Sequence, residues 1–369
     1  MSITIHALAE NKRGSFPENI RFGTVFSDHM FTQVYDEGSG WRDARIGPYR
    51  KFSLDPAAAV LHYGQEVFEG LKAYRRADGG INLFRPDQNM RRFNDSATRM
   101  MMPQVDEAFH LESLNTLVGL DQAWVPDQEG SSLYIRPAMI ATSPKLGLGA
   151  ADSYLHFIIT GPAGPYFEQG FNPVSVYIAD RHRRAVVGGV GEVKTGGNYA
   201  ASLLVSEEAA RKGFTQVLWL DAVEGRFVEE VGAMNICFVY GGSKIVTPSL
   251  SGSILPGITR DSLLQLAPVL GYEVGEERLD IHRLLADIEA GEVTEVFGCG
   301  TAAVISPVGQ LALHDRVHEI NNNLPGPVAK RLFDELTGIQ YGLRDDPFGW
   351  VTPLSSVADC PAPLRSQTG

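Results

Sequence analysis

Positive charge, cysteine and long hydrophobic runs are all scarce in this sequence. Its 369 residues include 32 lysines and arginines against 44 aspartates and glutamates, for a formal net charge of -12. A surface that binds nucleic acid needs clustered lysine and arginine, so the composition argues against a nucleic-acid partner. Charges or glycines interrupt every candidate hydrophobic span, and residues 1–6 contain neither a basic leader nor a long apolar stretch. We therefore expect no membrane contact and a cytoplasmic location.

The chain has 3 cysteines, at Cys237, Cys299 and Cys360, and no C-x-x-C pair. Such a set supports no disulfide framework and suits a reducing compartment. Cys237 and Cys299 lie in apolar, strand-like runs, so we interpret them as small buried hydrophobic residues. No metal site is predicted.

With 44% hydrophobic residues, a chain of this length can bury large cores and is more consistent with two domains than with one. The clearest breaker cluster is GPAGP at residues 161–165. We predict a smaller N-terminal domain at 1–162, a linker at 163–175 and a larger C-terminal domain at 176–369.

Hydrophobic periodicity predicts the elements that carry the motifs. An amphipathic helix is expected at 87–101, and Tyr134 and Arg136, two residues apart on a strand at 132–137, should point to the same face. The remaining strands are expected at 154–160, 174–180, 215–221, 235–240 and 244–248, and the remaining helices at 199–212, 260–270 and 281–290. A hairpin turn is expected at 240–243, and the mixture predicts an α+β fold.

The most informative segment is GGVGEVKTGGNY at residues 188–199. A lysine that condenses with an aldehyde must be neutral for part of the reaction, in a tight site that backbone can approach closely. Taken alone, this glycine-rich segment is equally compatible with a flexible surface loop. A second segment, EEVGAMN at 229–235, favours the functional interpretation of Lys194.

Together these segments resemble the branched-chain amino-acid aminotransferases, which are pyridoxal-phosphate enzymes of fold type IV. The resemblance extends over most of the chain, through LHYG at 61–64, FEGLKAY at 68–74, LFRP at 83–86, NMRR at 89–92, LYIRP at 133–137, LPGITR at 255–260 and FGCGTAA at 297–303. It implies a small N-terminal α/β domain, a larger pseudo-barrel domain and a cofactor, pyridoxal 5'-phosphate, at their interface.

For the cofactor, the resemblance implies that Lys194 forms the Schiff base and carries the proton, and that Tyr199 hydrogen-bonds the phenolic oxygen. A carboxylate must face the pyridine nitrogen to keep it protonated. Adjacent strand residues face opposite ways, so only one of Glu229 and Glu230 can do so, and the family pattern selects Glu230. The phosphate is assigned to Ile258 and Thr259 at a helix N-terminus, to Thr301 and to an arginine. The family pattern selects Arg92 over its neighbour Arg91.

For the substrate, the resemblance assigns the walls of an apolar slot to Tyr63, Phe68, Tyr134 and Tyr166, with Leu146 and Leu148 contributed by the partner subunit of a homodimer. The segment Thr301, Ala302 and Ala303 would bind the carboxylate, helped by Arg136. Arg136 could instead belong to a buried structural ion pair. Ala233 stands where some relatives have threonine, which leaves the ranking of substrates open.

The implied activity is transfer of the amino group of leucine, isoleucine or valine to 2-oxoglutarate, giving glutamate, by a ping-pong reaction with a pyridoxamine intermediate. The alternative functions are those of other fold type IV enzymes, namely a D-amino-acid aminotransferase or an aminodeoxychorismate lyase. These share the lysine, the glutamate and the phosphate site, but are shorter and differ in their N-terminal motifs.

Overall fold

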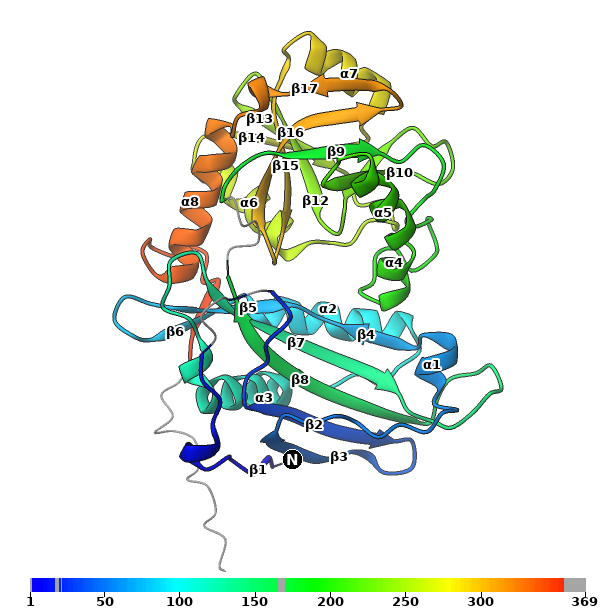
Figure 1. Cartoon of the computed structure of the whole chain (residues 1–369), viewed down its shortest axis with the longest axis vertical. Helices are drawn as coiled ribbons and strands as arrows, with labels where there is room; N and C mark the ends of the chain where they lie inside the picture. Colours follow the sequence, from blue (N-terminus) through cyan, green and yellow to red (C-terminus); the bar gives the residue numbers. More distant parts are fainter. Residues whose placement is uncertain (1, 17–19, 21, 165–169, 355–369) are drawn as a thin grey trace, which may run out of the picture. The chain divides into compact units, whose positions relative to one another are not determined.

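A computed structural model describes residues 2–16, 20, 22–164 and 170–354 of the chain. The residues divide into two compact units, and the change from the first to the second falls inside the predicted linker, 163–175. Each unit is built on its own sheet of nine strands (Figure 1). This combination of helices with largely antiparallel sheets confirms the predicted α+β class.

The sheet of unit 1 has the strand order β1-β3-β2-β8-β7-β5-β6-β18, with β4 paired to β7. Apart from the parallel pair of β1 and β3, its strands pair antiparallel. Its strands are β1 (Thr4–Ile5), β2 (His29–Asp36), β3 (Gly40–Pro48), β4 (Glu66–Phe68), β5 (Leu71–Arg75), β6 (Ile81–Phe84), β7 (Ser132–Ala141), β8 (Ser153–Ala163) and β18 (Val351–Pro353).

Helices α2 and α3 cover one face of this sheet (Figure 1). Met90, Phe93 and Ala97 form the predicted apolar stripe of α2 and are buried against β4, β7 and β8. Helix α3 begins after Asp106, whose carboxylate accepts the N–H of Phe109 at 2.7 Å and so satisfies a free helix-end donor. The helices of unit 1 are α1 (Ala59–Tyr63), α2 (Pro86–Arg99) and α3 (Glu107–Leu120), with single 3-10 turns at Glu10–Lys12 and Gln122–Trp124.

Strand β8 continues through Gly161 and Pro162, where the sequence predicted a break. Strand β2 pairs with β8 only as far as Ile159, whereas β7 stays paired with β8 up to Ala163. At Pro162, β8 is therefore paired with β7 alone. Proline lacks a backbone N–H, but no strand pairs with β8 on the β2 side at this position, so no hydrogen bond of the sheet is lost.

Unit 2 contains the second sheet, of order β11-β10-β9-β16-β15-β12-β13-β14, with β17 paired to β16. Its strands are β9 (Val174–Ile178), β10 (Gln216–Leu220), β11 (Val228–Val231), β12 (Asn235–Tyr240), β13 (Lys244–Pro248), β14 (Glu273–Glu277), β15 (Val293–Gly300), β16 (Val304–Leu313) and β17 (Arg316–Glu319). The predicted hairpin joins β12 to β13, and Gly241 and Gly242 take the positive φ values, 54° and 70°, that its tight turn requires.

One apolar cluster in unit 2 receives side chains from β9, β10, β11, β12, β13, β15 and β16 together with α7. A flat sheet could not bring so many strands onto one core, so the sheet curls as the pseudo-barrel prediction requires. The helices are α4 (Gly196–Ala200), α5 (Leu203–Arg211), α6 (Ile258–Val269), α7 (Ile281–Glu289) and α8 (Pro327–Tyr341), with a 3-10 turn at Asn321–Asn323. The end of α8, from Ile339, belongs to unit 1. No helix in the described parts of either unit is long and apolar enough to cross a membrane.

Two features differ from the predicted organisation. The helix expected at 199–212 is divided into α4 and α5 by a turn at 201–202. The described residues from Ile339 on group with unit 1 rather than with the predicted domain 176–369, and they make unit 1 the longer unit. The cause is a non-local strand pairing, because β18 adds to the edge of β6 with Val351 opposite Phe84.

Candidate active site

Lys194 lies two residues before the short helix α4, and its amine faces Tyr199 within that helix. Its Nζ donates a hydrogen bond to the hydroxyl of Tyr199 at 2.5 Å. Asn198 holds the preceding loop in place, because its Nδ2 donates to the carbonyl oxygens of Val190 at 2.7 Å and Val193 at 2.9 Å. The sequence therefore folds so that the lysine and the tyrosine meet across one turn.

Glu230 and Glu229 are neighbours on β11 and point to opposite sides, as strand geometry requires. Glu230 lines the same small cavity as Tyr199 and Ala233, whereas Glu229 lines a different cavity. Burial raises the pKa of Glu230, and the charges of Arg184 and Lys194 oppose that rise. Lys194 is thus among the charges that act on the pKa of Glu230.

Arg184 is a site residue that the sequence reasoning missed. Its Nε lies 2.9 Å from Oε2 of Glu230, and both side chains are buried. Oε1 of Glu230 accepts the backbone N–H of Leu255 at 2.9 Å. The carboxylate is thus held from two sides in an orientation fixed before any ligand arrives. No local pattern marks Arg184, which follows Arg181 and Arg183 in a basic stretch.

Helix α6 begins at Ile258, directly after Gly257, so the amides of Ile258 and Thr259 lie at a helix N-terminus. The first hydrogen bond of this turn runs from the amide of Asp261 to the carbonyl of Gly257 at 2.9 Å. The earlier amides have no partner within the helix and suit an anion. A Cβ on residue 257 would overlap Oδ1 of Asn235, so this approach requires glycine.

Thr301, Ala302 and Ala303 form the turn between β15 and β16. Thr301 and Ala302 are half-buried and Ala303 is buried. The next residue, Val304, has a φ of 61°, a left-handed conformation that a β-branched residue rarely adopts. Such strain costs roughly 1–3 kcal/mol and gathers at functional sites. No sequence pattern marks this conformation.

In unit 1, the structure distinguishes the two adjacent arginines of α2. The Arg91 side chain is 59% exposed and lies 3.8 Å from Asp87. Arg92 is buried, and its Nε and Nη2 donate to the two carboxylate oxygens of Glu69 at 2.7 and 3.0 Å. Successive residues of a helix point about 100° apart, so Arg92 faces the interior of unit 1 whereas Arg91 faces solvent.

Three of the predicted substrate residues of unit 1 gather on the sheet face opposite α2 and α3. Arg136 donates to the hydroxyl of Tyr134 at 2.9 Å, and its guanidinium carbon lies 4.7 Å from the centre of the Phe68 ring. This arrangement follows from strand alternation, because Leu133 and Ile135 point into the core. Arg136 stacks on rings and forms no ion pair with the described residues, which disfavours its alternative interpretation as part of a structural ion pair.

Two further residues shape this cluster without having been predicted. Phe22 meets the Tyr134 ring edge-on, with 4.8 Å between ring centres. At position 70 a Cβ would overlap the hydroxyl of Tyr134, so Gly70 lets the tyrosine lie flat against the backbone.

Tyr63, Leu146 and Leu148 lie at the surface of unit 1. Tyr63 ends α1, is exposed, and donates its hydroxyl to the carbonyl of Leu146. Leu146 and Leu148 follow β7 and are among the most exposed apolar side chains, at 65% and 87%. Tyr166 lies outside the described residues.

Known proteins are similar to this chain over most of its length. The family described as Amino-transferase class IV matches residues 66–311. Branched-chain-amino-acid aminotransferase 2 of Bacillus subtilis (strain 168) is 48% identical over 97% of this chain and 98% of its own length. A probable branched-chain-amino-acid aminotransferase of Staphylococcus aureus (strain N315) is 52% identical over 89% of this chain and 92% of its own.

Solved structures with a similar fold lead to the same family. The branched-chain amino acid aminotransferase of Escherichia coli matches with a TM-score of 0.73 and 28% identity, covering 88% of this chain and 99% of that one. The enzyme of the same name from Thermobaculum terrenum, solved in its PLP-form, matches with a TM-score of 0.73 and 28% identity, covering 89% and 98%. By its matched region and by these relatives, the chain belongs to the class IV aminotransferases.

Proposed function

We propose that this protein is a branched-chain L-amino-acid transaminase that uses pyridoxal 5'-phosphate to move the amino group of leucine, isoleucine or valine to 2-oxoglutarate. The proposal depends on three residues of unit 2. Lys194 donates a hydrogen bond to Tyr199 at 2.5 Å, and burial raises the pKa of Glu230 while the positive charge of Lys194 opposes that rise. The names of relatives near 50% identity support the substrate class.

Lys194 has two tasks in this proposal. When bound, the cofactor supplies an aldehyde that condenses with amines and a ring that accepts electrons. Lys194 Nζ would be the amine that holds this aldehyde, and the same amine would accept the proton at the substrate α-carbon. Tyr199, whose hydroxyl accepts the hydrogen bond from Nζ, orients the amine, and this hydroxyl would donate to the phenolic oxygen of the cofactor.

Glu230 is proposed as the partner of the pyridine nitrogen. A carboxylate beside that nitrogen favours its protonated form, and Arg184 helps to keep the buried Glu230 ionised. Glu230 also lines the same cavity as Tyr199, the hydrogen-bond partner of Lys194, which supports Glu230 over Glu229.

The phosphate is proposed to bind the amides of Ile258 and Thr259, where the helix dipole favours an anion. Thr301 would add a hydroxyl and Arg92 a cation. The Gly257 backbone, held against Asn235 without room for a Cβ, supports this cradle. Thus the residues present fit the group that the family implies.

The substrate slot is proposed to use Tyr63, Phe68 and Tyr134 as walls, with Arg136 attracting a carboxylate. The backbone of Thr301, Ala302 and Ala303 would also receive a carboxylate. Exposed Leu146 and Leu148 would reach the site of a second copy in a homodimer, and sedimentation at micromolar concentration tests that assembly. A cytoplasmic location remains the expectation from the scarcity of cysteine.

A steady-state screen of L-amino acids against 2-oxoglutarate tests the proposal. Leucine, isoleucine and valine should give glutamate and the matching 2-oxo acids at rates far above alanine or aspartate. Preference for D-alanine, or release of pyruvate from aminodeoxychorismate, would replace the proposal with one of the two alternative activities.

A further inference from the structure

Glu229, the neighbour of Glu230 on β11, has no role in the function proposed above. Its side chain is buried, and its Oε1 accepts a hydrogen bond from the hydroxyl of Ser253, which is buried as well. Within the described residues, no other hydrogen bond reaches the Glu229 carboxylate. Burying a carboxylate with a single donor is costly, so the contact with Ser253 is the part of this arrangement that needs a functional explanation.

Ser253 connects Glu229 to Arg184. The backbone carbonyl of Ser253 accepts a hydrogen bond from Nη2 of Arg184, while the side chain of Ser253 holds Glu229. The same arginine lies against Glu230, with 2.9 Å between its Nε and Oε2 of that carboxylate. A chain of polar contacts therefore runs from Glu229 through Ser253 and Arg184 to Glu230, although the two glutamates point to opposite sides of β11.

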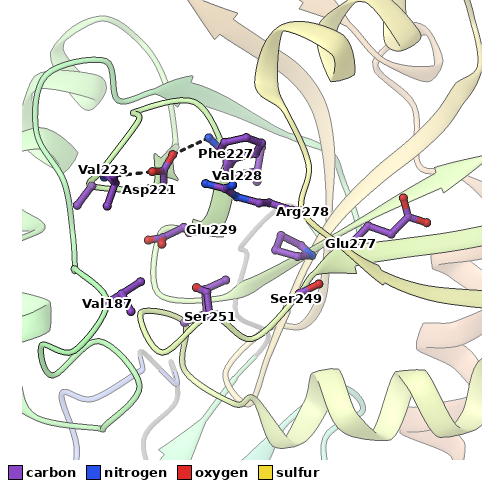
Figure 2. A pocket seen from close by; sticks show the side chains of 13 residues that line it. Val187, Asp221, Val223, Phe227, Val228, Glu229, Ser249, Ser251, Glu277 and Arg278 are labelled. Carbon is purple, nitrogen blue, oxygen red and sulfur yellow. Dashed lines mark hydrogen bonds between the residues drawn. The ribbon is translucent and has the colours of Figure 1, made fainter.

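The segment from Ser251 to Leu255 also contacts Glu230 directly. The backbone N–H of Leu255 donates to Oε1 of Glu230 at 2.9 Å. Ser251, at the start of the segment, lines the same cavity as Glu229, and Figure 2 shows both side chains. The position of this one segment therefore determines both contacts that hold Glu230, the one from Leu255 and the one through Arg184.

Close packing confines Ser253 on the side of the loop that leads to Lys194. A Cβ at position 191 would overlap the carbonyl oxygen of Ser253, which is the oxygen that Arg184 binds. Nη2 of Arg184 also donates to the carbonyl of Gly191 at 3.5 Å. Backbone packing thus limits Ser253 from one direction, and the hydrogen bond to Glu229 holds it through its side chain.

Electrostatics connects the same residues. Burial raises the pKa of Glu229, and the hydrogen bond from Ser253 and the charge of Arg184 oppose that rise. Burial also raises the pKa of Glu230, where the charge of Arg184 opposes the rise and the charge of Glu229 adds to it. Two buried carboxylates that depend on one arginine stay ionised only while that arginine keeps its position.

We propose that Glu229 is a positioning residue for Glu230. Glu229 fixes Ser253, Ser253 fixes Arg184, and Arg184 together with the N–H of Leu255 sets the orientation of the Glu230 carboxylate. The inference rests on the proposed function only in assigning Glu230 to the pyridine nitrogen of the cofactor. Glu229 itself touches neither substrate nor cofactor, so its loss slows turnover and leaves substrate affinity unchanged.

Steady-state kinetics of the full-length holoenzyme with leucine and 2-oxoglutarate test the proposal. Glu229→Ala should lower kcat roughly tenfold and leave KM within about twofold, because a small misplacement of a catalytic group costs rate rather than affinity. Glu229→Gln should keep kcat within about threefold, since its amide oxygen still accepts the Ser253 hydroxyl. The control Glu277→Ala removes a carboxylate of the same cavity wall, one held by Lys244 at 2.7 Å, and should leave kcat within about twofold.

Combined variants separate positioning from a general structural role. Ser253→Ala should reproduce the loss in kcat, and Glu229→Ala with Ser253→Ala should be no slower than either alone, because both changes break the same contact. In a Glu230→Gln background, Glu229→Ala should cost less than about twofold, because residue 230 then carries no charge to be oriented. A purely structural residue would cost its full factor in every background. Ser253→Ala also keeps the test valid if Glu229→Ala folds poorly.

Hydrogen exchange of the holoenzyme, followed by mass spectrometry, gives a readout independent of turnover. A peptide covering residues 250–257 should exchange about fivefold faster or more in Glu229→Ala and Ser253→Ala, because the N–H of Leu255 loses its fixed acceptor, and at the wild-type rate in Glu229→Gln. If the wild-type protein does not transaminate leucine, the proposed function fails and the exchange data alone decide this inference. Wild-type exchange in both alanine variants, or an active wild type with undiminished kcat in both, would overturn it.

Discussion

Replacing Arg92 with alanine should destabilise the protein even without cofactor. Arg92 donates two hydrogen bonds, of 2.7 and 3.0 Å, to Glu69, whose side chain is only 1% exposed. Asn89 and the backbone N–H of Gly70 also donate to Glu69, at 2.8 and 3.1 Å, but these neutral donors do not neutralise its charge. Breaking a buried ion pair from one side typically costs about 3–5 kcal/mol, because it leaves an uncompensated charge. For a unit of this size that lowers Tm by roughly 6–20 °C.

Urea unfolding of the apo-protein, followed by circular dichroism, measures this effect. Arg91→Ala is the matched control, because Arg91 is exposed and 3.8 Å from Asp87, and it should change the free energy of unfolding by less than about 0.5 kcal/mol. The double variant Arg92→Ala with Glu69→Gln should recover part of the lost free energy of unfolding, because residue 69 then carries no charge. If apo Arg92→Ala unfolds within about 1 kcal/mol of Arg91→Ala, the reasoning from the buried pair is refuted.

The phosphate role of Arg92 needs a separate measurement. At a temperature where the variant is folded, its affinity for pyridoxal phosphate should fall by one to two decades, as expected for a charge-assisted contact of about 1.5–3 kcal/mol. A variant that is destabilised but binds the cofactor with wild-type affinity would make Arg92 purely structural.

Three further perturbations probe other residues of the two units. Glu230→Gln should lower kcat for leucine by roughly 10²-fold and Glu229→Gln by much less, and stopped-flow rates that reverse this order would give the role to Glu229. Gly257→Ala should weaken cofactor binding at least tenfold by forcing a Cβ onto Asn235, and titration should show recovery in Gly257→Ala with Asn235→Ala. Burial lowers the pKa of His110 from its ordinary value near 6.5 to about 4. As the pH drops, His110 is therefore protonated in the unfolded chain before it is protonated in the folded protein. The free energy of unfolding should fall between about pH 6.5 and pH 4. By denaturant titration at both pH values, His110→Leu should remove about 3 kcal/mol of that fall, and an unchanged pH dependence would contradict the assignment.

The parts of the fold that periodicity governs were predictable from the sequence. The stripe of Met90, Phe93 and Ala97 made α2 amphipathic, and the spacing of Tyr134 and Arg136 put both on one face of β7. Both features depend on residues a few positions apart, where backbone geometry fixes the relation. The family resemblance, confirmed by the match to class IV aminotransferases, supplied the rest of the expected site.

The contacts between distant segments were not predictable. Glu69 pairs with Arg92 across 23 positions, and Arg184 meets Glu230 across helices α4 and α5 and strand β10. Likewise β18 joins β6 from the far end of the chain, which moved the C-terminal boundary of the second domain. Such pairings are set by the tertiary packing and have no periodic signal.

Attachment of the cofactor to Lys194 underlies the whole proposed mechanism, and covalent mapping tests it most directly. Holoenzyme is reduced with sodium borohydride, digested and analysed by peptide mass spectrometry, with Lys194→Ala treated in parallel. We expect a phosphopyridoxyl adduct on Lys194 in the wild-type protein and none on the corresponding peptide of the variant, which should also lose turnover with leucine. An adduct on another lysine, or Lys194→Ala turning over at near wild-type rates, would show that Lys194 does not carry the cofactor.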